Sequence, residues 1–152
     1  GHFEGVLDVM NKLTKIVKPK KIFMGEKDFQ QLYLVKKELE KKYKTKVIPC
    51  KTIRDKDNVA LSSRNLLLNK SNLTIAAKIY ETLVDIKKNT KNKKNIPSFL
   101  NLKKKELKNN YKIKIDYLEL RNIKNLKLSN TKNNSRLFIA YYLKNVRLID
   151  NL

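Results

Sequence analysis

Long amphipathic stretches alternate with short apolar ones over residues 4–50, and this alternation restricts the fold more than any other feature of the chain. Apolar residues recur at helical spacing over 4–17, and Pro19 ends the pattern. The apolar run at 21–24 predicts a buried strand. A second amphipathic stretch over 29–43 and a second strand-like run at 46–50 repeat the order. Helix, strand, helix, strand predicts a parallel sheet covered by helices.

The second part of the chain has a different organisation. Residues 51–65 are polar and show no period. Helical patterns follow at 71–88 and 97–110, joined by a lysine–asparagine linker, and strand patterns close the chain at 114–120, 135–143 and 146–150. Helices followed by clustered strands predict a separate α+β unit. We therefore expect a boundary near residues 52–54 and two domains, 1–52 and 53–152.

The net charge of +22 permits two interpretations. A basic surface neutralises nucleic-acid phosphates, so the chain could be a basic nucleic-acid-binding module. However, the 36 basic residues comprise 31 Lys and 5 Arg, and they occur with 18 Asn. Base recognition relies on Arg more than on Lys. We favour the interpretation that the lysines are solvated and reflect the codon composition of an AT-rich genome, and we expect no specific nucleic-acid partner.

Several other classes of protein are disfavoured by composition. No stretch has the roughly 18 consecutive apolar residues of a membrane span, and no signal-peptide pattern is present. A single cysteine and a single histidine argue against a disulfide framework and against a metal site built from protein ligands. These features predict a cytoplasmic protein without membrane association. Because the first residue is Gly1, we expect the chain to start inside a longer protein.

The first candidate site is the turn "GEKDFQQ" at 25–31. A ligand loop in an open α/β sheet lies at the carboxyl end of a strand, where Gly25 allows the chain to turn. Asp28 can cap the start of the next helix or complement its dipole. Helix-start amides favour an anion, and Lys27 adds a full charge. On a helical turn Lys27, Asp28 and Gln31 project from neighbouring positions. The residues alone support equally a ligand site and a capped helix with solvated side chains.

The second candidate is "ALSSRN" at 60–65. Two hydroxyl groups and Arg64, whose guanidinium forms a bidentate fork, make a potential triphosphate clamp. Taken alone, the stretch is more typical of an ordinary loop with a helix cap. In that interpretation Arg54 and Asp55 form a hinge or surface pair.

Together these motifs resemble the pantoate–β-alanine ligase (pantothenate synthetase) family. The resemblance rests on "GHF-GV" at 1–6, "GEKDFQQL" at 25–32, "I-R--D--ALSSRN-LL" at 53–67 and "RLIDN" at 147–151, which span essentially the whole chain. It implies an α/β fold: a partial Rossmann-like nucleotidyltransferase (adenylate-forming) domain at 1–52, which binds ATP and pantoate, followed by a smaller α+β C-terminal lid domain at 53–152.

The resemblance also implies a reaction. The pantoate carboxylate attacks the α-phosphate of ATP to give pantoyl adenylate and pyrophosphate, and β-alanine then displaces AMP to give pantothenate. ATP is thus a substrate, and Mg²⁺ assists by neutralising phosphate charge. Closure about residues 52–54 would exclude water from the adenylate.

Site residues follow from the resemblance by matching positions. Lys27 and Arg64 would be catalytic, and Gln31 would hydrogen-bond pantoate. No residue is assigned as a metal ligand. The ATP-binding set would be Gly25, Glu26, Lys27, Asp28, Ile53, Leu61, Ser62, Ser63 and Arg64, with Ile53 lining the adenine pocket through its backbone.

The resemblance lacks one part of the family pattern. The family's first Rossmann half, with its His-x-Gly-His motif, has no counterpart in this sequence, so we expect a fragment that makes no pantothenate alone and exposes an aggregation-prone edge. The family also implies a homodimer of the full-length protein. Besides the nucleic-acid alternative, another adenylating nucleotidyltransferase would share this architecture.

Overall fold

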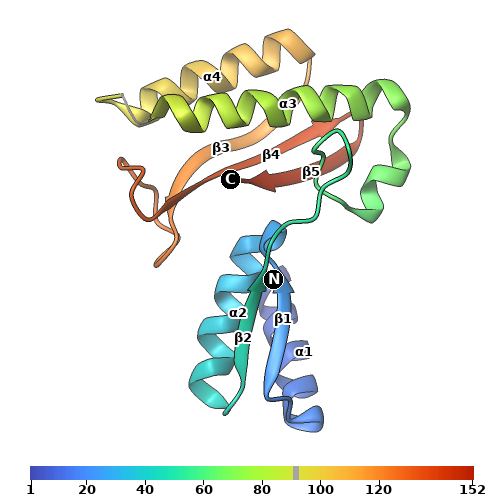
Figure 1. The fold of residues 1–152 in the computed structure, drawn as a ribbon, viewed down its shortest axis with the longest axis vertical. Helices are drawn as coiled ribbons and strands as arrows, with labels where there is room; N and C mark the ends of the chain where they lie inside the picture. The colour runs from blue at the N-terminus through green and yellow to red at the C-terminus, as the bar shows by residue number, and fades with distance from the viewer. Residues whose placement is uncertain (91–92) are drawn as a thin grey trace. The chain divides into compact units, whose positions relative to one another are not determined.

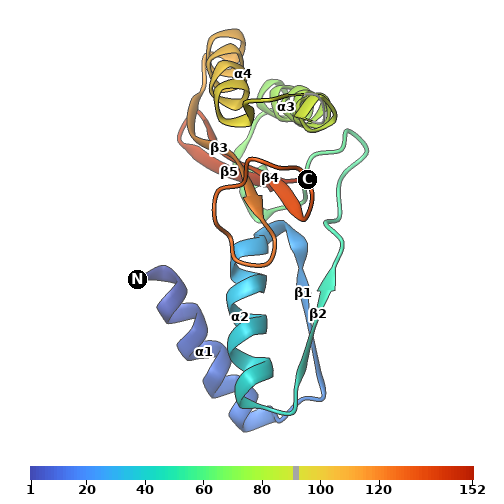
Figure 2. The ribbon, with the colours of Figure 1, turned by 90° about the vertical axis from the view of Figure 1, so that its left-hand side faces the viewer.

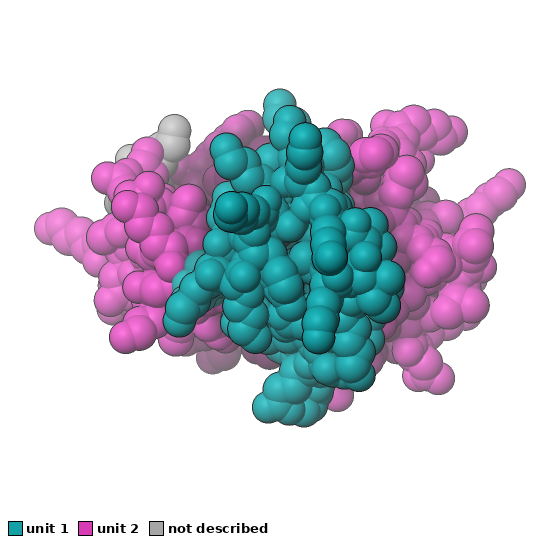
Figure 3. Space-filling model, turned by 90° about the horizontal axis from the view of Figure 1, so that it is seen from below, with its two compact units in different colours: residues 1–52 teal, residues 53–152 magenta. Residues whose placement is uncertain are grey.

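The computed structural model describes residues 1–90 and 93–152, so part of the lysine–asparagine linker, residues 91–92, lies outside the described residues. The chain divides into two compact units, Gly1–Thr52 and Ile53–Leu152. Figure 3 colours unit 1 teal and unit 2 magenta. Each unit has its own hydrophobic core.

Unit 1 has the predicted order of helix, strand, helix, strand. Its elements are α1 (His2–Val17), β1 (Lys21–Gly25), the short 3₁₀ helix η1 (Glu26–Asp28), α2 (Phe29–Lys42) and β2 (Lys46–Cys50). β1 and β2 pair in parallel, from Lys21 opposite Lys46 to Gly25 opposite Cys50. The predicted parallel pair is thereby confirmed, because a helical crossover allows two successive strands to run in the same direction.

One face of the β1–β2 pair is covered and the other is open. Both helices lie on the same side of the strands in Figure 2. On that side Val35 and Leu39 of α2 are fully buried with Val47 of β2. Strand side chains alternate between faces, and Phe23, which points the other way from its half-buried neighbours, is 66% exposed. Unit 1 is therefore an α/β layer with one uncovered face.

Unit 2 is a two-layer α+β body. Helices α3 (Lys70–Asn89) and α4 (Ile96–Tyr111) cover one face of an antiparallel sheet (Figures 1 and 2). The sheet has the order β3 (Lys114–Asn122), β4 (Ser135–Leu143), β5 (Val146–Asn151). The central strand β4 is almost continuously buried, as its run of apolar residues requires. All the helices and strands expected from the sequence are present, with ends that differ by one or two residues.

Caps explain several of the helix boundaries. The side chain of Asn69 accepts a hydrogen bond from the amide of Asn72 at the start of α3, and Asn95 accepts one from Ser98 at the start of α4. At the ends of α1 and α4, Lys18 and Lys112 adopt the left-handed conformation. No helix within residues 1–90 and 93–152 has the length and apolar character to cross a membrane.

Candidate functional site

The turn after β1 lies where an α/β fold places its ligands. β1 ends at Gly25, η1 occupies Glu26–Asp28, and α2 begins at Phe29. The carboxyl ends of both parallel strands lie together, because Gly25 is opposite Cys50 in the register. Backbone amides of η1 and of the first turn of α2 therefore belong to the strand edge at which parallel sheets bind phosphates.

Gly25 does not have the conformational role expected from the sequence. Its φ of −69° and ψ of 135° are ordinary extended backbone that any residue adopts, so the chain needs no glycine to turn there. A β-carbon at this position would meet no other atom within 4 Å. The open space beside Gly25 is compatible with a ligand approaching the backbone.

The charged residues of the turn are arranged side by side. The ammonium nitrogen of Lys27 lies 3.8 Å from an Asp28 carboxylate oxygen, with 19% of the Lys27 side chain exposed and 53% of the Asp28 side chain. Of the two roles expected for Asp28 at the start of α2, capping through the side chain is wrong, whereas an acidic residue does stand at the start of the helix. Asp28 occupies the cap position, but its carboxylate accepts no hydrogen bond from the helix amides. That carboxylate therefore remains directed to solvent and to Lys27, and Gln31 is half-buried one turn further on.

The segment that leads into the second candidate stretch is folded back on itself by backbone hydrogen bonds. The amide of Leu61 donates to the carbonyl of Ile53 at 3.0 Å, and Arg54 and Ala60 form an isolated antiparallel bridge. Between them Asp55 accepts hydrogen bonds from the amides of Asp57 and Val59, both at 2.9 Å. These contacts fold residues 53–61 into a compact hairpin-like loop, which we call the 53–61 loop.

The residues proposed to contact phosphates follow this loop directly. Leu61 is 52% exposed, and Ser62 caps η2 (Ser63–Leu67) by accepting a hydrogen bond from the amide of Arg64 at 3.3 Å. The exposed Arg64 donates through Nη1 to the backbone carbonyl of Arg147 at 2.8 Å. One of the five N–H groups of the guanidinium is used in this bond, so the fork that would bind a phosphate is still available.

Arg54 and Asp55 do not form the surface pair considered from the sequence. Arg54 instead donates two hydrogen bonds to Asp150 on β5, Nη1 to Oδ2 at 2.7 Å and Nη2 to Oδ1 at 2.8 Å. Sequence reasoning missed this pair because the two residues are 96 positions apart. The signal that could have found it is that one residue lies in the 53–67 motif and the other in the 147–151 motif.

The predicted site residues thus form two groups, one in each unit. Unit 1 holds Gly25, Glu26, Lys27, Asp28 and Gln31 on consecutive turns of η1 and α2. Unit 2 holds Ile53, Leu61, Ser62, Ser63 and Arg64 in the 53–61 loop and the start of η2.

A metal held by the protein alone does not fit the described residues. Over 1–90 and 93–152, no group of three or more histidine, cysteine, aspartate or glutamate side chains is close enough to hold an ion. Mg²⁺ in nucleotide sites is commonly bound through substrate phosphates with one or two carboxylates. The exposed Asp28 carboxylate fits that mode of binding.

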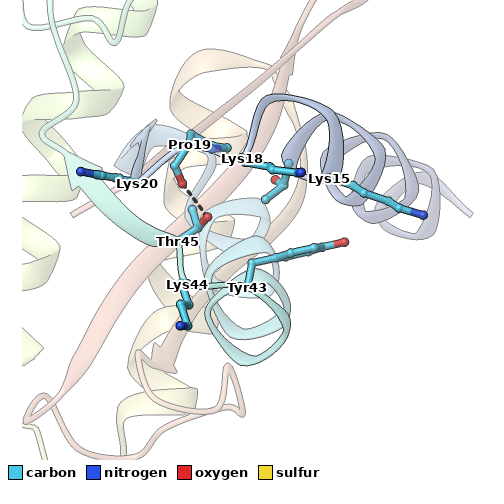
Figure 4. A pocket seen from close by; sticks show the side chains of 8 residues that line it. Lys15, Lys18, Pro19, Lys20, Tyr43, Lys44 and Thr45 are labelled. Carbon is cyan, nitrogen blue, oxygen red and sulfur yellow. Dashed lines mark hydrogen bonds between the residues drawn. The ribbon is translucent and has the colours of Figure 1, made fainter.

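A cavity of about 370 Å³ lies at the opposite ends of the strands from Gly25. Its lining comes from the segments that precede β1 and β2, and it includes Lys15, Lys18, Lys20 and Lys44. In Figure 4 these lysine side chains fan outward and do not converge on a common point. Thr45 donates to the carbonyl of Pro19 at 2.6 Å across the cavity floor. The cavity was not predicted from the sequence, and its lysines do not form an anion cradle.

A parallel strand pair with a polar turn at its carboxyl edge, followed by a separate α+β unit, defines an α/β protein with a candidate ligand-binding turn. The comparisons with known proteins agree with this class. A model of the pantoate-beta-alanine ligase family matches residues 1–152. The chain belongs to the pantoate–β-alanine ligase family.

Similar proteins extend this result. Pantothenate synthetase of Flavobacterium psychrophilum is 38% identical over 158 residues, a match that covers all of this chain and 55% of the relative. The crystal structure of pantothenate synthetase from Thermus thermophilus superposes with a TM-score of 0.89 at 29% identity, covering 100% of this chain and 56% of that one. These matches confirm the predicted fold class.

A third comparison concerns a protein solved with ligands. The pantoate-beta-alanine ligase of Francisella tularensis, crystallised with β-γ ATP and β-alanine, has a TM-score of 0.72 at 35% identity, covering 100% of this chain and 50% of that one. The chain thus spans about half the length of the relatives it matches.

Proposed function

We propose that this chain supplies about half of a pantoate–β-alanine ligase, which condenses pantoate with β-alanine at the expense of ATP. In the first step a pantoate carboxylate oxygen attacks the α-phosphorus of ATP, the bond to the bridging oxygen breaks, and pyrophosphate leaves. In the second step the β-alanine nitrogen attacks the acyl carbon of the adenylate, loses a proton, and AMP leaves. The products are pantothenate, AMP and pyrophosphate.

The turn of unit 1 would serve the first step. Negative charge grows on the α-phosphate oxygens as the carboxylate attacks, and a fixed cation beside them lowers the barrier. Lys27 is suited to this role because its side chain is only 19% exposed and it belongs to η1, directly before the first turn of α2. Gly25, Glu26 and Asp28 would complete the ATP contacts of unit 1. Half-buried Gln31 would orient pantoate through its amide.

The loop of unit 2 would hold the phosphates. Arg64 offers a planar fork that matches two phosphate oxygens, while Leu61, Ser62 and Ser63 would contribute backbone and hydroxyl donors. Ile53 would contact adenine. Its carbonyl already accepts the Leu61 amide, so its own amide N–H, the remaining lone pair of its carbonyl and its exposed side chain are what it could offer. Mg²⁺ would be held by phosphate oxygens with Asp28 and would neutralise phosphate charge.

The single observation that carries the proposal is the position of "GEKDFQQ". In a chain whose whole length matches the family, this stretch forms the turn at the carboxyl end of β1. From the resemblance we also infer that the full-length enzyme is a cytoplasmic homodimer, that unit 1 is the ATP- and pantoate-binding part, and that unit 2 corresponds to the C-terminal lid domain. Family membership favours this reaction over the nucleic-acid module and over other adenylating enzymes.

The experiment uses a completed enzyme, in which residues 1–152 are joined to the part of the Flavobacterium psychrophilum pantothenate synthetase that they do not match. Exchange of labelled pyrophosphate into ATP is measured with pantoate and, separately, with amino acids. We expect exchange that requires pantoate. Exchange with an amino acid would favour another adenylating enzyme, and a folded hybrid without exchange would contradict the proposal.

A further inference from the structure

Two distant motifs meet in unit 2. Arg54 lies at the start of the 53–61 loop, and Asp150 lies near the end of the chain on β5. The guanidinium and the carboxylate face each other with two parallel hydrogen bonds of 2.7 and 2.8 Å. This fork-to-fork geometry fixes both distance and orientation, unlike a single-bond contact between flexible side chains.

The pair is also largely withdrawn from solvent. Only 15% of the Arg54 side chain and 9% of the Asp150 side chain are exposed. Arg54 lies 4.2 Å over the ring centre of Tyr80 and donates a further bond to the carbonyl of Asn58 at 3.0 Å. Asp150 accepts another from the Asn151 amide at 2.7 Å. Buried ion pairs add little net stability on average, because desolvation offsets attraction, so this full set of partners calls for another explanation.

The environment of Arg54 favours its charged form. Burial alone would lower the pKa of Arg54, but its hydrogen bonds to Asp150 and the charge of that carboxylate outweigh burial and raise the pKa above its ordinary value. The nearby Tyr141 stays neutral, because burial and then the Asp150 charge raise the pKa of its phenol.

The pair holds the loop that presents the proposed phosphate-binding residues. Arg54 bridges to Ala60 through the backbone, and Ala60 is buried. The next residue, Leu61, is tied to Ile53, and the side-chain amide of Asn65 donates to the Ala60 carbonyl at 3.0 Å. Residues 61–64 are thus attached at both ends to a segment that is fixed to β5 through Arg54.

We propose that Arg54 and Asp150 are positioning residues that hold the segment 61–64 ready for a triphosphate. The triphosphate ligand in this inference rests on the proposed function, whereas the geometry of the Arg54–Asp150 pair does not depend on it. A positioning pair differs from a purely stabilising pair in the effect of losing one partner. Loss of either residue should loosen residues 53–64 selectively, and it should weaken the use of ATP more than the use of β-alanine.

The test compares Arg54→Met and Asp150→Asn with a control, Arg121→Met. Arg121 also pairs with a carboxylate, Glu119, at 2.8 Å, but on β3. Hydrogen exchange of the 152-residue chain is followed at the amides of Val59 and Leu61 and, for reference, at the buried Leu107 of α4. We expect at least tenfold faster exchange at Val59 and Leu61 in both loop variants, no change at Leu107, and no loop change in Arg121→Met.

Kinetics of the completed enzyme provide the second readout. We expect the KM for ATP to rise at least tenfold in Arg54→Met and Asp150→Asn, while the KM for β-alanine changes less than twofold. The double variant should resemble either single one, since both act through one contact. Additive effects, equal changes in both KM values, or unchanged loop exchange would overturn the inference. If the parent enzyme lacks pantoate-dependent exchange, the proposed function fails, and the hydrogen-exchange comparison still decides the positioning role.

Discussion

The guanidinium of Arg64 donates a hydrogen bond to the backbone carbonyl of Arg147, 2.8 Å away. The bond is exposed, so water competes with it and it adds little to stability. The terminal oxygens of a phosphate share its negative charge and would be stronger acceptors than this carbonyl. The bond therefore orients Arg64 on the surface of unit 2 without committing the side chain to a structural role.

Replacement of Arg64 tests this interpretation. In the completed enzyme we expect Arg64→Ala to slow adenylate formation about 100-fold, or about 2.7 kcal/mol, as is usual when one charge-stabilising donor is lost. The melting temperature should not change. Arg147→Ala is the control, because it keeps the backbone carbonyl that Arg64 uses. Equal losses in the two variants would contradict a specific role for Arg64.

Lys27 should matter through its position and not through its charge alone. We expect Lys27→Ala to reduce the rate of pantoate-dependent pyrophosphate exchange by about 100-fold or more, since the cation acts on charge that develops in the transition state. Lys37→Ala removes an equal charge from an exposed site on α2 and should leave the rate within about twofold. The basic-module alternative is favoured if both variants lose the same small, salt-dependent amount of affinity for nucleic acid and have the same exchange rate.

Replacement of Gly25 distinguishes a conformational role of this glycine from a role in binding ATP. Because its φ is −69° and an added β-carbon meets no atom within 4 Å, Gly25→Ala should leave stability unchanged or raise it by about 0.5 kcal/mol. The affinity for ATP should nevertheless fall, because the methyl group would occupy the space proposed for the nucleotide. Thermal unfolding and ATP titration of the completed enzyme measure the two effects. A variant with unchanged ATP affinity would show that no ligand approaches this backbone.

Alkaline pH should destabilise unit 2 through Tyr141. Burial raises the pKa of this phenol in the folded protein above its ordinary value of 10.0. Above pH 10 the unfolded state therefore loses a proton that the folded state retains, so the free energy of unfolding falls as pH rises. Urea unfolding at a series of pH values between 9 and 11 measures the slope. Tyr141→Phe should flatten it, and an unchanged slope would mean that another group controls the alkaline transition.

The isolated chain should self-associate and make no pantothenate. It spans about half the length of its relatives, and α1 carries the exposed apolar residues Val9, Leu13 and Ile16, of which Ile16 is 76% exposed. Phe23 on the open face of β1 adds to this surface. Light scattering should show less association for Ile16→Glu than for Lys15→Glu, which alters charge on the neighbouring polar position. Pantothenate production by the monomeric 152-residue chain would contradict this expectation.

The sequence predicted elements well where the determining interactions are local. Patterns of apolar residues predicted the four α-helices and five strands named above to within one or two residues, though not the short 3₁₀ helices, and the order of elements predicted the parallel pair. It failed where the outcome depends on side-chain geometry or on distant contacts. Asp28 has the right residue type for a cap, but its carboxylate is not directed at the helix amides.

The 53–61 loop of unit 2 shows the failure that comes from distant contacts. Local reasoning paired Arg54 with its neighbour Asp55. In the structure Asp55 accepts hydrogen bonds from amides of the turn, and Arg54 donates to Asp150, 96 residues away on β5. A contact of this kind depends on tertiary packing of β5 beside the loop. Composition and spacing carry no information about it, although both residues lie in motifs that the family resemblance had identified.

The central claim, that the turn after β1 activates ATP toward pantoate, is tested most directly by pantoate-dependent exchange of labelled pyrophosphate into ATP. The measurement compares the completed enzyme with its Lys27→Ala variant. We predict exchange that requires pantoate in the parent and is lost by about two orders of magnitude in the variant. Exchange that does not need pantoate, or that proceeds equally well without the Lys27 ammonium group, would contradict the claim.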